Sequence, residues 1–257
     1  MLPVIGLPRG RLQGPTYEFL RDFGVHLPSY DPAANSRNYQ IDTPHATYVV
    51  DHPKDLVKRV ALSDLNAAIV GGDSSNEFSA EWAESEKANL GGLRAIYYPP
   101  AEIQAIELPP YRQWYLTVLA RQDTQDNNFS DMLTRLHRRD IRYLVHSWTE
   151  YPYAQKQLME RTLPGIKVGI YPYSSGEVLV FPSSGSTESK LRRGDSMFGL
   201  EIVSSGETSR LNGLKEFGET TVRCKPTLIK PRDYKDPFVT DLIGRFEEYR
   251  LLTAHDV

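Results

Sequence analysis

The stretch EIVSSGETSRLNGLKE, residues 201–216, decides the fold of this sequence. Strand-compatible residues run from Glu201 into small hydroxyl residues around Gly206, and a helix-compatible segment follows. Successive backbone N–H groups in such a turn point at one anion, and the amino end of the helix adds positive potential. The pattern suits a phosphate-binding loop, but it is also typical of an ordinary Ser/Thr-capped helix, and the local motif alone does not decide between them. The loop consists of Ser204, Ser205, Gly206, Glu207 and Thr208.

Strand and helix patterns alternate on both sides of this stretch. Before residue 110, strands are expected at residues 2–7, 39–50 and 65–70, and helices at 15–23 and 53–60. Beyond it, strands are expected at 114–120, 141–145, 166–171, 178–181 and 221–229, and helices at 129–138, 152–161 and 237–252. The alternation predicts an α/β protein with mainly parallel pairing in its second half.

The length of 257 residues accommodates one large or two small domains. A proline-marked stretch at residues 99–110 is typical of a crossing between lobes. We expect lobe I to comprise residues 1–110 with residues 215–257 returning to it, and lobe II to comprise residues 111–214 with the phosphate-binding loop.

Composition excludes several classes of protein. Thirty basic and 33 acidic residues give a net charge of -3 without a block of one sign, so neither nucleic acid nor a membrane surface is an expected partner. Cys224 is the single cysteine, and no run of 18 apolar residues occurs. We expect a cytoplasmic protein without disulfides. The six histidines show no HExxH spacing, and GxxxxGK[ST] and GxGxxG are absent, so the sequence predicts no zinc site and none of the common nucleotide loops.

Five segments together resemble one enzyme family. They are VIGLPRGRLQGPTYEFLRDFGV (4–25), NSRNYQID (35–42), HPKDLVKRV with LNAAIVGGD (52–73), GSTE (185–188) and IVSSGETSRLNGL (202–214). In this order they resemble ATP phosphoribosyltransferase, the enzyme that opens histidine biosynthesis. The likeness covers most of the chain and is weak from about residue 97 to residue 182.

The resemblance implies a two-lobed fold like that of type II periplasmic binding proteins, with a ligand cleft between the lobes. Phosphoribosyl pyrophosphate would meet ATP there, with Mg²⁺ bound mainly through the pyrophosphate. By similarity, the residues from Ser204 to Thr208 hold the donor's 5-phosphate, and Glu201 faces the ribose hydroxyls. Arg9 and Arg11 face the nucleotide and pyrophosphate charges.

Three further residues have supporting roles by similarity. Arg37 would assist the other two arginines, while Asp73 and Glu188 would support magnesium or orient basic residues. The alternatives are a solvated surface charge for the arginines and a capping or salt-bridge role for the carboxylates.

The resemblance also implies partners. The chain resembles the short form of the family, whose catalytic subunit works with a histidyl-tRNA-synthetase-like regulatory subunit, and a homo-oligomer is expected.

The sequence departs from the family at four positions. Asn66 and Met197 stand where acidic residues are usual, Glu201 replaces Asp, and Ser209 replaces Leu. These departures motivate two alternatives: the same donor with another base or heterocycle as acceptor, or a protein that binds a small molecule or regulates a partner without catalysis.

Overall fold

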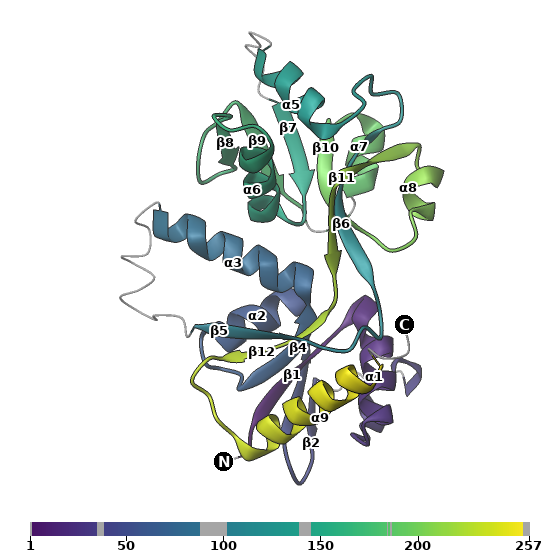
Figure 1. Ribbon diagram of the computed structural model, residues 1–257, viewed down its shortest axis with the longest axis vertical. Coiled ribbons are helices and arrows are strands. Elements are labelled where there is room, and N and C mark those ends of the chain that lie inside the picture. Colours follow the sequence, from purple (N-terminus) through teal and green to yellow (C-terminus); the bar gives the residue numbers. More distant parts are fainter. Residues whose placement is uncertain are drawn as a thin grey trace. The chain divides into compact units, whose positions relative to one another are not determined.

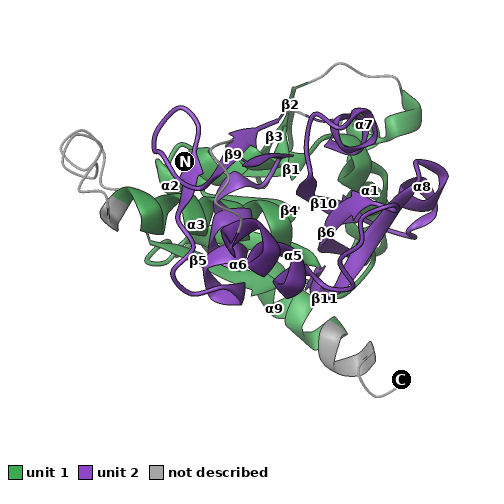
Figure 2. Cartoon of the chain, turned by 90° about the horizontal axis from the view of Figure 1, so that it is seen from above, with its two compact units in different colours: residues 1–113, 225–257 green, residues 114–224 purple. Residues whose placement is uncertain are grey.

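The computed structural model describes residues 2–34, 39–87, 102–138, 145–183, 185 and 187–253. The chain divides into two compact units, residues 1–113 with 225–257, and residues 114–224 (Figure 2). The chain returns to unit 1 at Lys225, later than the predicted residue 215, because strand β11 (Leu214–Cys224) pairs with strand β6 (Trp114–Arg121) in unit 2. The single strand predicted at residues 221–229 is therefore wrong: it is the end of β11 followed by β12 (Pro226–Pro231) of unit 1.

Unit 1 is built on a six-stranded sheet in the order β2-β3-β1-β4-β12-β5 (Figure 1). Strand β1 (Val4–Pro8) runs parallel to β3 (Thr47–Asp51) and to β4 (Ala67–Gly71). The edge strands β2 (Gln40–Asp42) and β5 (Ile103–Glu107) pair antiparallel with their neighbours β3 and β12, and β12 also runs antiparallel to β4. The carboxyl ends of the three parallel strands therefore meet at one edge, where ligands of α/β proteins gather.

Helices cover both faces of this sheet. Phe19 of α1 (Gln13–Asp22) and Phe246 of α9 (Pro237–Thr253) pack in one core cluster with Leu7 of β1. On the other face, α2 (Pro53–Ala61) contributes Leu56 to a second cluster. A Cβ at Gly6 would lie 2.7 Å from Leu56 Cδ2, so this glycine permits the close packing of α2 on β1.

Short and unexpected helices complete unit 1. The 3₁₀ turns η1 (Gly10–Leu12), η2 (Pro28–Tyr30) and η3 (Pro32–Ala34) follow β1 and α1. The long helix α3 (Gly72–Lys87) follows β4, where the sequence predicted only a glycine turn. Within the described part of the chain, no helix is both long enough and apolar enough to cross a membrane.

Unit 2 contains two three-stranded sheets. Strand β6 lies between β10 (Phe198–Val203) and β11, and both pairings are antiparallel. Strand β9 (Val178–Pro182) lies between β7 (Val145–Thr149) and β8 (Val168–Ile170), and both pairings are parallel. The expectation of mainly parallel pairing thus holds for one sheet only. The chain enters the unit on β6 and leaves on β11, with Trp114 paired to Cys224, so these two strands run in opposite directions.

Four helices belong to unit 2 in its described part: α5 (Phe129–Arg138), α6 (Pro152–Thr162), α7 (Thr187–Arg193) and α8 (Glu207–Leu211). The predicted helix at residues 129–138 is confirmed, and the prediction at 152–161 is one residue short. Most of the strand predicted at 141–145 lies outside the described residues, and β7 begins at its last residue.

Candidate functional site

The predicted loop leaves β10 at Val203 and enters α8 at Glu207. Gly206 adopts the left-handed conformation, with φ 70° and ψ −2°, and has no side chain to cap the helix. A Cβ at this position would lie 2.9 Å from Glu216 Oε1. The positive φ favours glycine at residue 206, and a side chain there would also displace the neighbouring carboxylate.

The loop rests against the strands β6 and β11. The Tyr115 hydroxyl donates to Glu216 Oε2 at 2.9 Å, and its oxygen would lie 3.8 Å from a Cβ at Gly206. Burial raises the pKa of Tyr115, and the hydrogen bond to Glu216 raises it further. The tyrosine thus stays protonated and acts as a fixed donor that orients Glu216 behind the loop, while Ser204, Ser205, Glu207 and Thr208 remain exposed.

Three glutamates converge beside the loop. Burial raises the pKa of Glu201, and the charges of Glu150 and Glu188 raise it further. The Ile202 N–H donates to Glu201 Oε1 at 2.8 Å and lowers this pKa in part. Burial also raises the pKa of Glu188. The site can therefore accept hydrogen bonds from a neutral polar ligand, and it holds Glu201 more readily protonated than a surface glutamate.

Thr187 reinforces this arrangement. Its side chain is fully buried, and its Oγ1 makes no hydrogen bond of normal geometry, although it lies near enough to Glu201 to lower the pKa of that carboxyl. Thr187 is therefore part of the buried surroundings of the Glu201 carboxyl.

Side-chain hydrogen bonds join β10 to β7 without a backbone ladder between them. The Ser147 hydroxyl donates to the Phe198 carbonyl at 2.6 Å. The buried amide of Gln155 donates to Ser147 Oγ at 2.5 Å and accepts from the Leu200 N–H at 2.7 Å. A Cβ at Gly199 would lie 2.4 Å from a carbonyl oxygen of β7, so glycine permits the approach. This attachment brings Glu201 close to Glu150, which follows β7.

Glu150 was not predicted from the sequence. The sequence could have indicated Glu150, because this residue directly follows a strand, and ligands of α/β proteins gather at the carboxyl ends of strands. Its proximity to Glu201 depends on the contacts between β7 and β10, which no local pattern reveals.

The remaining predicted residues lie in unit 1. Arg9 and Arg11 follow β1 at the carboxyl edge of the sheet, and both are exposed. The Arg9 guanidinium lies 4.6 Å from the centroid of the Tyr39 ring. Asp73 is buried in the first turn of α3, where the Ser74 hydroxyl donates to it at 3.3 Å. Arg37 lies outside the described residues. The structure thus places Arg9, Arg11 and Asp73 after parallel strands of one sheet.

The structure explains one unusual residue, Asn66, and gives no explanation for another, Met197. Asn66 Oδ1 accepts from the Val4 N–H at 2.7 Å, so this side chain fixes the start of β1, at the end of the strand opposite Arg9. Met197 directly precedes β10, and its backbone N–H donates to the His146 carbonyl. Neither substitution lies at the carboxyl edge of its strand.

Ser209 is the third unusual residue, and it carries a cost in stability. Its side chain is buried, and its Oγ has no hydrogen-bond partner. We expect Ser209→Ala to raise the free energy of unfolding by about 1 kcal/mol, since it removes an unsatisfied buried hydroxyl. Denaturant titration measures this change. Thr208→Ala is the control, because Thr208 is exposed on the same helix. The prediction is wrong if Ser209→Ala raises the free energy of unfolding by no more than Thr208→Ala does.

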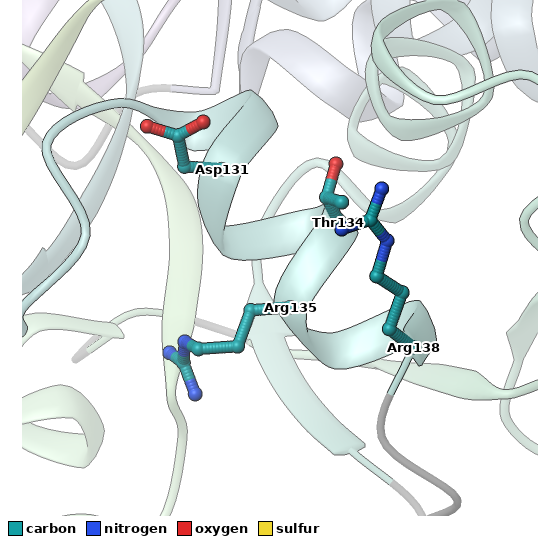
Figure 3. Close-up of a pocket in the computed structure, with 4 residues that line it drawn as sticks. All are labelled: Asp131, Thr134, Arg135 and Arg138. Atoms are coloured by element: carbon teal, nitrogen blue, oxygen red, sulfur yellow. The ribbon is translucent and has the colours of Figure 1, made fainter.

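A separate hollow of about 440 Å³ lies along α5, lined by Asp131, Thr134, Arg135 and Arg138 (Figure 3). Arg138 points toward Thr134, whereas Arg135 points away from both (Figure 3). Arg135 donates to the two oxygens of Asp126 at 2.9 and 2.6 Å. None of the predicted site residues lines this hollow, and we assign it no role.

Comparisons with known proteins concern the whole chain. No protein-family model matches the sequence, and no curated protein sequence matches it. Among solved structures, the ATP phosphoribosyl transferase (HisG:HisZ) complex from Thermotoga maritima is similar with a TM-score of 0.63 at 12% identity, over 99% of this chain and 100% of that chain.

Two further solved structures are similar to a lesser degree. The AvGluR1 ligand-binding domain in complex with methionine has a TM-score of 0.54 at 15% identity, covering 99% of this chain and 92% of that chain. XAC2383 from Xanthomonas citri, bound to ATP, has a TM-score of 0.50 at 9% identity, covering 94% of this chain and 80% of that chain. At these identities the likeness concerns the fold, which is the two-lobed α/β fold of type II periplasmic binding proteins, as predicted.

Proposed function

We propose that the chain is a phosphoribosyltransferase that moves the 5-phosphoribosyl group from phosphoribosyl pyrophosphate to N1 of ATP and releases pyrophosphate. The observation that carries this proposal is the glycine-centred loop of residues 204–208 directly after Glu201. The loop offers backbone N–H groups and hydroxyls to a phosphate. The carboxylates beside it accept hydrogen bonds from sugar hydroxyls.

The proposed chemistry suits these residue types. The acceptor nitrogen forms a bond to C1 of the ribose while the bond from C1 to the diphosphate oxygen breaks, and the diphosphate leaves with the electron pair. The ribose acquires positive charge during this displacement, so a nearby carboxylate stabilises it and fixed donors hold the two phosphate ends. Glu201 would accept from the ribose hydroxyls, and Arg9 and Arg11 would face the charges of ATP and pyrophosphate. Bidentate guanidinium groups suit that role.

Mg²⁺ would enter as part of the donor. In the part of the chain that the structure describes, no group of three or more His, Cys, Asp or Glu side chains is placed to hold a metal ion. We propose that the ion binds to the diphosphate of the donor. When bound, the ion would neutralise part of the charge of the diphosphate.

The similar Thermotoga maritima complex supports this choice of reaction and also suggests a partner. That complex contains two kinds of subunit by its description, and we propose a comparable regulatory subunit, related to histidyl-tRNA synthetase, together with a homo-oligomer of this chain.

A second candidate function is transfer from the same donor to another base or heterocycle. In a variant of this candidate, the protein binds a small molecule or regulates a partner without catalysis. Glu201 favours it, because a carboxylate one methylene longer than the family's Asp, with a raised pKa, alters the charge beside the sugar. The likeness to two-lobed binding domains is compatible with the version without catalysis.

Release of pyrophosphate separates these functions. The purified full chain is incubated with Mg²⁺, phosphoribosyl pyrophosphate and either ATP or a panel of nucleobases and heterocycles. We expect release that depends on ATP. Release with another acceptor alone would replace ATP in the proposal, and donor binding without release under any acceptor would support a binding protein. A chain that binds no donor would overturn the proposal.

A further inference from the structure

Lys190 of α7 holds its ammonium group against two uncharged partners. Its Nζ lies 2.5 Å from Ser183 Oγ and 4.2 Å from the centroid of the Trp148 ring. An ammonium has three N–H donors, and these contacts engage two of them. Among the residues that the structure describes, no carboxylate forms an ion pair with Lys190. The half-buried ammonium can therefore donate a further hydrogen bond to an anion.

The aromatic ring beneath the ammonium is itself held in place. Trp148 stacks on Phe181, its partner across the parallel strands, at 4.8 Å between ring centroids. Phe181 stacks in turn on Tyr171 at 4.9 Å. Because a cation over a fixed ring face has few positions available, Lys190 is oriented before any ligand arrives.

Ser183 connects this ammonium to the carboxylate site. Its N–H donates to the Thr149 carbonyl at 2.8 Å, and its hydroxyl donates to the Gly185 carbonyl at 2.7 Å. Gly185 has a φ of +81°, and a Cβ there would lie 3.5 Å from Glu150 Oε1. The Lys190 and Ser183 pair is therefore next to Glu150, at the carboxyl ends of β7 and β9.

Ser183 and Gly185 thus relate the Lys190 ammonium to Glu150, and Glu150 lies near enough to Glu201 to raise the pKa of that carboxyl. Glu201 lies on β10, which leads into the loop of residues 204–208. Phosphoribosyl pyrophosphate carries a phosphate on C5 and a diphosphate on C1 of its ribose, so a donor whose 5-phosphate binds at this loop needs a second group for its diphosphate. We propose that Lys190, oriented by Ser183 and Trp148, binds the diphosphate of the donor.

This inference rests on the proposed function and adds a residue that stabilises the leaving group. When the bond from C1 to the diphosphate oxygen breaks, the electron pair and the negative charge pass to the diphosphate. The Lys190 ammonium offsets that charge by a charge-assisted hydrogen bond, and no proton transfer is needed.

Calorimetry on the full chain tests the assignment with two ligands. Phosphoribosyl pyrophosphate with Mg²⁺ carries the diphosphate, whereas ribose 5-phosphate lacks it. Lys190→Met keeps most of the length of the side chain and removes the charge. We expect it to weaken binding of phosphoribosyl pyrophosphate by about tenfold to a hundredfold and to leave binding of ribose 5-phosphate within about twofold of the parent. Lys190→Arg should restore part of the affinity.

The matched control is Lys156→Met, which removes a lysine of the same unit whose ammonium pairs with Glu160 at 3.5 Å. It should bind both ligands as the parent does. If Lys190→Met binds both ligands like the parent, or loses both equally, the assignment of Lys190 is wrong and the proposed function stands. If the parent binds neither ligand, both the assignment and the proposed function fall.

Discussion

Replacing Gly206 with valine is expected to reduce donor binding more than about a hundredfold, to a level that calorimetry no longer detects. Residue 206 has a φ of 70°, which costs a residue with a Cβ about 1–2 kcal/mol. The added Cβ would also lie 2.9 Å from Glu216 Oε1, and Glu216 is itself held by Tyr115. The loop or the Glu216 side chain must therefore shift, and we expect the shift to disturb the N–H groups that would bind the phosphate.

Gly213→Val separates the two causes of this loss. Gly213 has a φ of +65° in the same unit, but a Cβ there would meet no atom within 4 Å. This control has a comparable backbone cost without the collision, and thermal unfolding would show whether both variants remain folded. We expect its donor affinity to remain near that of the parent. Parent-like donor binding by Gly206→Val would show that the site is not at this loop.

Replacing Glu201 with glutamine is expected to lower kcat/KM for pyrophosphate release by about a hundredfold, a loss typical of a displaced or missing charge beside a reacting centre. A neutral amide retains the size of the side chain but does not stabilise the positive charge that the ribose acquires. Steady-state kinetics measures the change. Glu177→Gln is the control, since Glu177 is exposed and pairs with His137 at 2.8 Å.

Glu201→Gln should also change how the free energy of unfolding depends on pH. Burial and two neighbouring carboxylates raise the pKa of Glu201 above its ordinary 4.5. The folded state therefore binds more protons than the unfolded state between these two pKa values, so the stability falls as the pH rises from about 4.5 through the raised pKa. Glu201→Gln should unfold at higher denaturant concentration than the parent at neutral pH, with a smaller decline across this range. If Glu201→Gln releases pyrophosphate as fast as the parent and its stability depends on pH as that of the parent does, the role assigned to Glu201 is wrong.

The fold was predictable where an element is determined by its own residues. The helix at 129–138 has a clear apolar stripe, with Phe129, Met132, Leu133 and Leu136 buried, and its bounds agree with the prediction. Helix α3 was missed because two glycines after a strand indicate a turn. In the structure, a Cβ at Gly72 would lie 3.2 Å from the Lys225 carbonyl, a contact with a distant part of the chain. The split between β11 and β12 likewise depends on different partner strands on either side of Lys225.

The candidate site was predictable in part for the same reason. The small residues around Gly206 indicate their turn locally, and the predicted turn is present. Glu150 and Lys190 escaped prediction, because each gains its place from contacts across strands. Glu150 approaches Glu201 through the hydrogen bonds between β7 and β10, and Lys190 is positioned by Trp148 and Ser183.

The pairing of Trp114 with Cys224 has a consequence for the architecture of the gene. Residues 114–224 form one uninterrupted segment, with its own sheets and core, whose first and last residues are neighbours on adjacent strands. Such a segment has the character of a cassette, because exchanging it needs only two junctions and leaves the hydrogen bonds of its strands intact. The unit that carries the loop of residues 204–208 can therefore diverge or recombine separately from the unit that carries Arg9 and Arg11.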